Sequence, residues 1–236
     1  MPRPSDPLAR ARLLEAAKAI FSEKGLDRAK VEDITNLAQL SKGAFYLHFE
    51  SKEEAFQELL AGIVSHLERL LDDAGDLQLA TLPGAGGLAG YVDDCHVRNV
   101  EIYAFIWENR ALMAMLMDGG GSANYQHLIE DFAQRAQRQT AALLQHGVEI
   151  GLYREDLDVE AAAAFIAGGF DRIARQLVKS PRKPDLDQML REVQRQLLGG
   201  VARPEVLAAL KLDSQKLSGA IDLERVEGAS SDLASG

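Results

Sequence analysis

The side chains best suited to chemistry are concentrated between residues 41 and 52 of the sequence. Hydroxyl, ammonium and imidazole groups recur there at short spacings, and all three can donate hydrogen bonds to phosphate oxygens. Lys42 can also donate to guanine, and Ala44 can contact a thymine methyl group. The pattern therefore indicates binding to nucleic acid. The candidate contact residues in this segment are Ser41, Lys42, Gly43, Ala44, Tyr46, His48 and Lys52.

Motifs of other chemistries are weak or absent in the sequence. The run Gly84–Ala89 fits a loose dinucleotide fingerprint, but Pro83 and helical sequence stand where the preceding strand would be needed. No two histidines have His-x-x-x-His spacing, Cys95 is the only cysteine, and no G-x-S-x-G motif occurs. We therefore expect no catalytic residue, no metal site and no cofactor.

Charge is distributed unevenly along the 236 residues. The formal net charge is −10, from 26 basic and 36 acidic side chains. Residues 1–56 hold nine of each sign, so the whole acidic excess lies in residues 57–236. DNA binding needs only a local basic surface, and the asymmetry indicates separate tasks for the two segments. Since 47% of the residues are hydrophobic and neither a signal peptide nor a membrane-spanning stretch is found, we expect a folded cytoplasmic protein with no membrane partner.

Two short helices are expected to position the candidate contact residues. An apolar pattern with helical period runs from Val31 to Ala38, and Ser41 is a good N-cap for a further short helix. Only about four residues separate the two helices, which is the spacing of a helix-turn-helix. In that motif one helix braces the DNA backbone while the next enters the major groove. Phe45 and Phe49 are expected to support this second helix from the core.

The sequence around this motif resembles the TetR family of bacterial transcriptional regulators. The resemblance covers about residues 8–56 and rests on Leu13–Ala17, Phe21–Gly25, Asp33-Ile34 and Ser41–Glu53 at fixed spacing. It implies a helix-turn-helix that binds double-stranded operator DNA. It also implies a larger helical body that binds a small-molecule effector and forms a homodimer.

Three places depart from the pattern of the family, and one of them is Thr35, which replaces a usual small alanine. Gln39 stands where the family usually has a glycine in the turn, so a left-handed backbone there would cost roughly 1 kcal/mol or more. Ala29 and Lys30 replace a usual pair of hydroxyl residues. Lys30 is therefore predicted to supply a positive charge to the DNA backbone where the family has a hydroxyl contact.

The rest of the chain reads with helical period and without a convincing strand, so the expected fold class is all-α. We predict a helix-turn-helix DNA-binding domain at residues 1–52, a helical ligand-binding and dimerisation domain at 53–218, and a polar C-terminal tail at 219–236. The helices expected at Asp158–Lys179 and Asp185–Leu198 each carry an apolar stripe. If these stripes face a second copy, they form a four-helix bundle with a two-fold axis.

Aromatic and methionine side chains gather in the middle of the chain. Core packing accounts for most of them, but the resemblance implies a ligand cavity among these helices, and such side chains suit one. The residues expected to line it are Tyr103, Trp107, Met113, Phe132 and Phe170.

The function that these observations favour is a transcriptional repressor released from its operator by a small molecule. A DNA-binding regulator without ligand control is the first alternative. A helical enzyme with a vestigial DNA-binding segment is the second, although the sequence shows no cluster of acid–base or metal-binding residues to support it.

Overall fold

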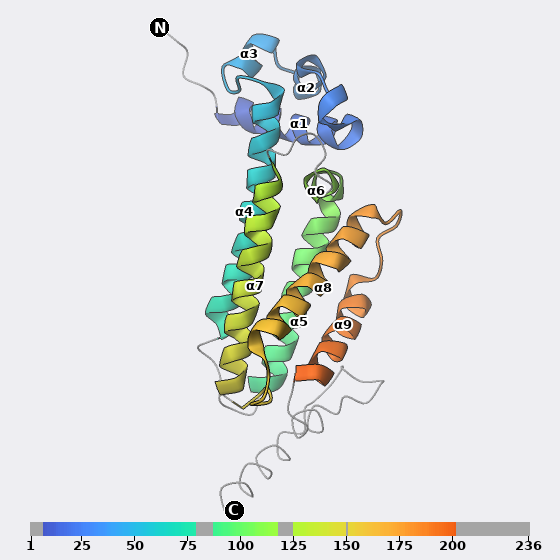
Figure 1. Cartoon of the computed structure of the whole chain (residues 1–236). Helices are drawn as coiled ribbons and strands as arrows, with labels where there is room; N and C mark the ends of the chain where they lie inside the picture. The colour runs from blue at the N-terminus through green and yellow to red at the C-terminus, as the bar shows by residue number, and fades with distance from the viewer. Residues whose placement is uncertain (1–6, 79–86, 118–124, 150, 202–236) are drawn as a thin grey trace, which may run out of the picture. The chain divides into compact units, whose positions relative to one another are not determined.

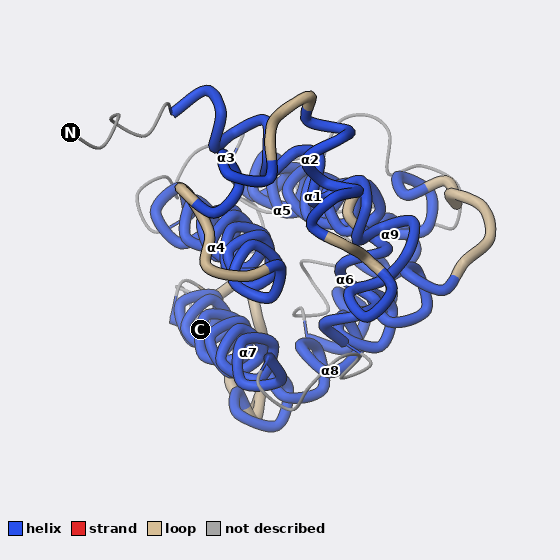
Figure 2. The backbone as a smooth tube through the Cα atoms, turned by 90° about the horizontal axis from the view of Figure 1, so that it is seen from above, coloured by secondary structure: helices blue, strands red, loops and turns tan. Residues whose placement is uncertain are grey.

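The computed structural model describes residues 7–78, 87–117, 125–149 and 151–201 (Figure 1). These residues form helices joined by short loops, and no strand occurs among them (Figure 2). The predicted all-α fold is confirmed, whereas the tail predicted at 219–236 lies outside the described residues. The helices are α1 (Pro7–Arg28), α2 (Val31–Ala38), α3 (Lys42–Tyr46), α4 (Lys52–Gln78), α5 (Gly87–Glu108), α6 (Arg110–Met117), α7 (Gln126–Glu149), α8 (Val159–Lys179) and α9 (Leu186–Val201).

The chain divides into two compact units. The first contains Met1–Glu68, Ile106–Phe132 and Arg175–Lys179, and the second contains Arg69–Phe105, Ala133–Ala174 and Ser180–Gly236. The predicted helix-turn-helix therefore belongs to the first unit, together with α6. None of the helices in the described ranges is both long enough and apolar enough to cross a bilayer.

Helix α1 supplies much of the core of the first unit, where it packs against α2, α3 and α6. Leu13, Ala17 and Phe21 lie on one face of α1 and are fully buried, as their spacing of three to four residues predicts. The ring of Phe21 meets Phe56 of α4 edge to face, with ring centroids 5.2 Å apart. This apolar contact joins the first helix to the start of the fourth.

The core of the second unit forms around the turn between α7 and α8. Gly151 has a φ of 75°, and the amides of Leu152 and Tyr153 donate to the carbonyl of Gly147 at 2.8 and 3.0 Å. The buried Tyr153 ring lies so close to Gly147 that a Cβ there would stand 2.2 Å from a ring carbon. Only glycine fits at this position without displacing the ring from the core. The buried side chains of the cluster are Val92, Leu144, Leu152, Tyr153, Ala163 and Leu198.

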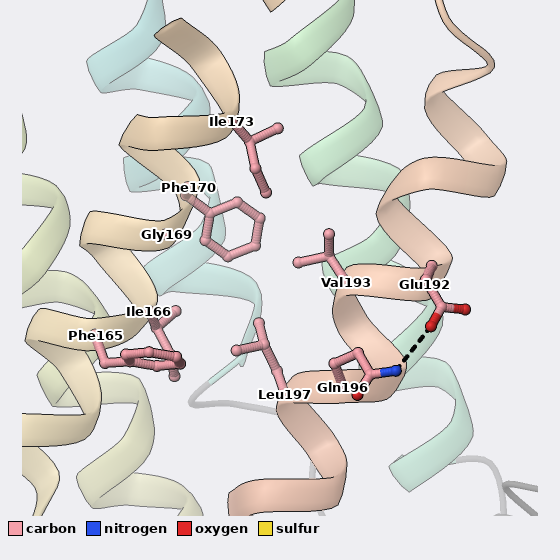
Figure 3. Close-up of a pocket in the computed structure, with 9 residues that line it drawn as sticks. All are labelled: Phe165, Ile166, Gly169, Phe170, Ile173, Glu192, Val193, Gln196 and Leu197. Carbon is pink, nitrogen blue, oxygen red and sulfur yellow. Dashed lines mark hydrogen bonds between the residues drawn. The ribbon is translucent and has the colours of Figure 1, made fainter. Parts of the chain in front are cut away.

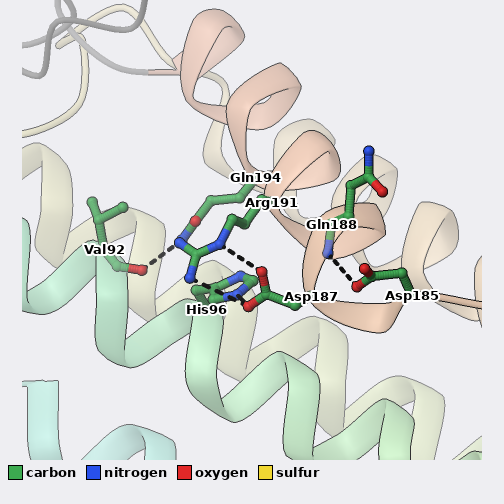
Figure 4. Close-up of polar contacts among 7 residues, drawn as sticks. All are labelled: Val92, His96, Asp185, Asp187, Gln188, Arg191 and Gln194. Carbon is green, nitrogen blue, oxygen red and sulfur yellow. Dashed lines mark hydrogen bonds and ion pairs between the residues drawn. The ribbon is translucent and has the colours of Figure 1, made fainter. Parts of the chain in front are cut away.

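Polar contacts join α9 to α5 within the second unit (Figure 4). The buried His96 places its Nε2 2.7 Å from the carboxylate of Asp187, and Gln194 donates to the Val92 carbonyl at 2.6 Å. A hydrogen bond from Arg191, followed by the one from His96, holds the pKa of Asp187 below its ordinary value. These contacts set the position of α9 along α5.

Candidate nucleic-acid interface

The turn between α2 and α3 has the left-handed backbone that was expected to be costly without glycine. Gln39 has φ 54° and ψ 43°, and in the described part of the chain it is the one non-glycine residue with positive φ. The amides of Gln39 and Leu40 donate back to Asn36 and Thr35 at 3.2 and 2.9 Å. These bonds satisfy carbonyls at the end of α2 and offset the backbone strain at Gln39.

Helix α3 is capped at its start and supported on one face by aromatic side chains. The hydroxyl of Ser41 accepts a hydrogen bond from the amide of Ala44 at 3.1 Å, which confirms Ser41 as the N-cap. Phe45 and Phe49 are 0% and 2% exposed, with ring centroids 5.3 Å apart, so their predicted place in the core is also confirmed. Burial of this face leaves the other face of α3 toward solvent.

The predicted DNA-contact residues differ in their exposure to solvent. Tyr46 is 51% exposed and rests edge-on against Phe45, with ring centroids 5.5 Å apart. The exposed members are Lys30, Ser41, Lys42, Gly43 and Tyr46, and the half-buried ones are Ala44, His48 and Lys52. Their contacts with DNA stay predictions.

The ammonium group of Lys42, predicted to read base edges, has an acidic partner within the same motif. Its Nζ lies 2.6 Å from Oε1 of Glu32 in the first turn of α2. The hydrogen bond from Lys42 lowers the pKa of Glu32, and the same bond raises the pKa of Lys42. Both groups are therefore charged at neutral pH, and the pair joins the starts of the two helices.

A second set of contacts fixes the start of α2. The amide of Lys30 donates to Asp33 at 3.1 Å, and Nζ of Lys24 lies 2.9 Å from the other carboxylate oxygen of Asp33. Hydrogen bonds from Lys24 and then from the Lys30 backbone lower the pKa of Asp33. Lys30 begins α2 without a side-chain hydrogen bond that caps the helix, and its side chain is exposed; its phosphate contact stays a prediction.

Lys52 joins the start of α4 to the end of α1. Gly25 has φ 74° and ψ 167°, so α1 kinks there and resumes as far as Arg28. The Lys52 ammonium donates to the carbonyls of Leu26, Asp27 and Ala29 at 2.7, 3.2 and 2.9 Å. These three bonds match the three N–H groups of an ammonium. Lys52 thus has a structural role. Its phosphate contact stays a prediction.

Sequence patterns do not identify two residues of this surface. Glu32 stands ten positions before Lys42, and the pair becomes apparent only when the crossing of α2 and α3 is known. Leu47 is 66% exposed between Tyr46 and His48. An apolar side chain beside polar groups gives no helical pattern by which to assign it.

Comparisons with known proteins agree with this geometry. A family described as "Bacterial regulatory proteins, tetR family" matches residues 13–59. The HTH-type transcriptional repressor KstR2 of Mycobacterium tuberculosis is 31% identical over 160 residues, covering 66% of this chain and 75% of that protein. The repressor DhaR of Mycobacterium sp. strain GP1 is 29% identical and covers 80% and 92%. The solved structure of M. tuberculosis KstR2 superposes with a TM-score of 0.58 at 26% identity, covering 82% and 95%.

The chain belongs to the TetR family. It is accordingly a DNA-binding transcriptional regulator, and the helix-turn-helix of the TetR family corresponds to α2 and α3. The named relatives are regulators, which disfavours the alternative of a helical enzyme.

The residues expected to line a TetR-family ligand cavity lie in both units. In the second unit the hydroxyl of the buried Tyr103 donates to the carbonyl of Phe170 at 2.6 Å, with ring centroids 6.1 Å apart. Burial, with a smaller effect from the charge of Asp171, raises the pKa of Tyr103. In the first unit Met113 is fully buried, Phe132 is half-buried, and the guanidinium of Arg110 lies 4.6 Å from the ring centroid of the half-buried Trp107. A shared cavity remains a prediction.

Replacing Lys52 by alanine tests its structural role. We expect Lys52→Ala to lower the free energy of unfolding by about 1–3 kcal/mol, because three carbonyls lose a charged donor. Duplex binding should weaken about equally for all sequences. Urea unfolding measures the first effect, and Lys18→Ala, which removes an exposed lysine of α1, is the matched control.

Unchanged stability of Lys52→Ala relative to Lys18→Ala would contradict the structural role. The salt dependence of duplex binding tests the phosphate contact separately. Loss of one phosphate contact reduces the slope of log affinity against log salt by about one, whereas loss of the carbonyl contacts alone leaves that slope unchanged.

Proposed function

We propose that the chain represses transcription as a homodimer that binds operator DNA through α3 and leaves it when a small molecule binds. The observation that carries the proposal is α3 itself, held by a strained turn and buried phenylalanines with its polar face toward solvent. The relatives KstR2 and DhaR are named as transcriptional repressors, which supports repression over activation.

Within this proposal the residues of the interface have two roles. Lys42 and Ala44 meet base edges at the start of the recognition helix, with Gly43 allowing close approach. Tyr46, His48 and the exposed Lys30 donate to phosphates on either side. Phosphate contacts fix the register of the protein on the duplex, whereas base contacts select the sequence.

A hollow between α8 and α9 supports the homodimer (Figure 3). Part of each predicted apolar stripe is buried within the chain, including Ala163 and Leu190. Other apolar side chains of the two helices line an open hollow of about 230 Å³, and Phe165 beside it is 77% exposed. An exposed phenylalanine next to an apolar hollow is self-complementary, because under a two-fold axis each Phe165 can enter the hollow of the other copy. The lining residues are Phe165, Ile166, Gly169, Phe170, Ile173, Glu192, Val193, Gln196 and Leu197.

Release of DNA requires an effector that binds one conformer of the protein better than the other. The expected cavity residues are mostly apolar, so the effector is a largely apolar or aromatic small molecule. Trp107 is the only tryptophan. A compound that changes its fluorescence and also releases bound duplex identifies such an effector, whereas compounds that change the fluorescence without loss of duplex binding contradict the coupling.

Selection of genomic fragments tests the DNA-binding surface. The wild-type chain should enrich duplexes with two related half-sites, and Lys42→Ala should change the preferred base at one position of each half-site because a direct base contact is lost. Sequencing of the enriched fragments measures the preference. Unchanged preference and affinity for Lys42→Ala would contradict the assignment of α3 as the recognition helix.

A charged substitution in the α8–α9 surface tests the homodimer. We expect light scattering at micromolar concentration to give twice the 25.7 kDa chain mass for the wild type and a shift toward the monomer for Phe165→Glu. Val97→Glu is the matched control, since Val97 of α5 is also an exposed apolar residue, at 54%. A wild-type monomer that still binds duplex normally would contradict dimerisation.

A further inference from the structure

An acidic residue stands within the proposed DNA-binding surface. The carboxylate of Glu32 accepts a hydrogen bond from the ammonium of Lys42, with Nζ 2.6 Å from Oε1. The side chains of Glu32 and Lys42 are 56% and 54% exposed. Exposed ion pairs contribute little to folding stability. The first turn of α2 favours an acid at this position, but the acid also places a negative charge within the surface that phosphates approach in the proposed complex.

The neighbouring acid of the same helical turn shows the contrast. Asp33 accepts a hydrogen bond from the amide of Lys30 at 3.1 Å, and its other carboxylate oxygen lies 2.9 Å from the ammonium of Lys24. These contacts fix the start of α2 and connect it to α1. The carboxylate of Glu32 contacts the recognition helix instead, at its first residue. Asp33 fixes the start of α2, whereas Glu32 joins that start to the side chain that is proposed to read bases.

We propose that Glu32 is a specificity-determining residue, which holds the Lys42 ammonium at the start of α3 and withholds its charge from the phosphates of non-operator DNA. This inference rests on the proposed function of α3.

The physical reason is that complexes with non-operator DNA and with the operator depend on different contacts. Binding to non-operator DNA depends on phosphate neutralisation. A lysine whose charge is balanced by a carboxylate adds little to this neutralisation. On the operator, an ammonium with three donors can keep its bond to Glu32 and still donate to a guanine. Glu32 therefore weakens binding to every duplex but weakens non-operator binding more.

The experiment compares Glu32→Gln with the wild type on a selected operator and on a random duplex over a range of salt concentrations. We expect Glu32→Gln to bind the random duplex about 3- to 10-fold more tightly, with a salt slope steeper by about one, because one more cation becomes available to phosphates. Operator affinity should change less, so the ratio of operator to random affinity falls. Glu101→Gln, which removes an exposed acid of α5 in the second unit, is the control for net charge.

Two further variants separate an effect of Glu32 on Lys42 from direct repulsion between the Glu32 carboxylate and phosphates. In a Lys42→Ala background the effect of Glu32→Gln on the random duplex should largely disappear, and Glu32→Asp, which keeps the charge, should stay close to the wild-type ratio. Urea unfolding confirms that each variant is folded.

Three results would overturn the inference while the wild type still binds duplex. These are an effect of Glu32→Gln no larger than that of Glu101→Gln, an equal gain on operator and random DNA, or a full effect in the Lys42→Ala background. A wild-type chain with no salt-dependent duplex binding would instead overturn the proposed function, and this inference with it.

Discussion

A helix as short as α3 cannot hold its conformation alone, because forming the first helical turn costs more free energy than one or two hydrogen bonds return. Lys42–Tyr46 is therefore helical only because its surroundings make it so. Burial of Phe45 and Phe49 fixes one face, and the Ser41 hydroxyl caps the start. The exposed face of α3 keeps its geometry only while this support holds.

The supporting contacts extend through the first unit as a chain of specific interactions. The left-handed backbone at Gln39 directs the chain from α2 into α3, and the Lys52 ammonium joins the start of α4 to the three carbonyls that follow the kink at Gly25. Phe21 and Phe56 add an apolar contact between α1 and α4. The recognition helix is thus presented by a rigid group of helices, which suits a protein that must read bases at fixed positions.

Electrostatics on this surface is balanced rather than simply basic. Residues 1–56 carry equal numbers of acidic and basic side chains, and two of the lysines near α2 are paired with acids of its first turn. Non-specific attraction to DNA grows with the number of unpaired cations. This balance of charge therefore lowers affinity for DNA in general, and in the proposed complex the direct contacts of α3 select the sequence.

Local chemistry made much of the DNA-binding segment predictable from sequence. The Ser41 cap and the buried Phe45 each follow from a residue type at a fixed position in a short motif, whereas the left-handed turn at Gln39 followed only from the resemblance to the family. The bond between Glu32 and Lys42 could not be predicted in this way, because it depends on how two helices cross. The structural role of Lys52 could not be predicted either, because its three carbonyl partners come together only after the chain kinks at Gly25.

In α8 and α9, too, the sequence predicted local features but not tertiary contacts. Helical periodicity predicted α8 and α9 and their apolar stripes. Asp158 caps α8 by accepting a hydrogen bond from the Ala161 amide at 3.0 Å. Periodicity could not divide each stripe into residues buried within the chain and residues left at the surface beside Phe165, because that division depends on tertiary packing.

In the proposed complex α3 lies in the major groove of the operator. Methylation interference tests this placement directly, because dimethyl sulfate modifies guanine at N7, an atom that faces the major groove. We expect methylation to block binding at guanines in two clusters, one in each half-site, with centres about one helical turn or more apart on the duplex. Binding that is insensitive to N7 methylation throughout the protected sequence would contradict this placement.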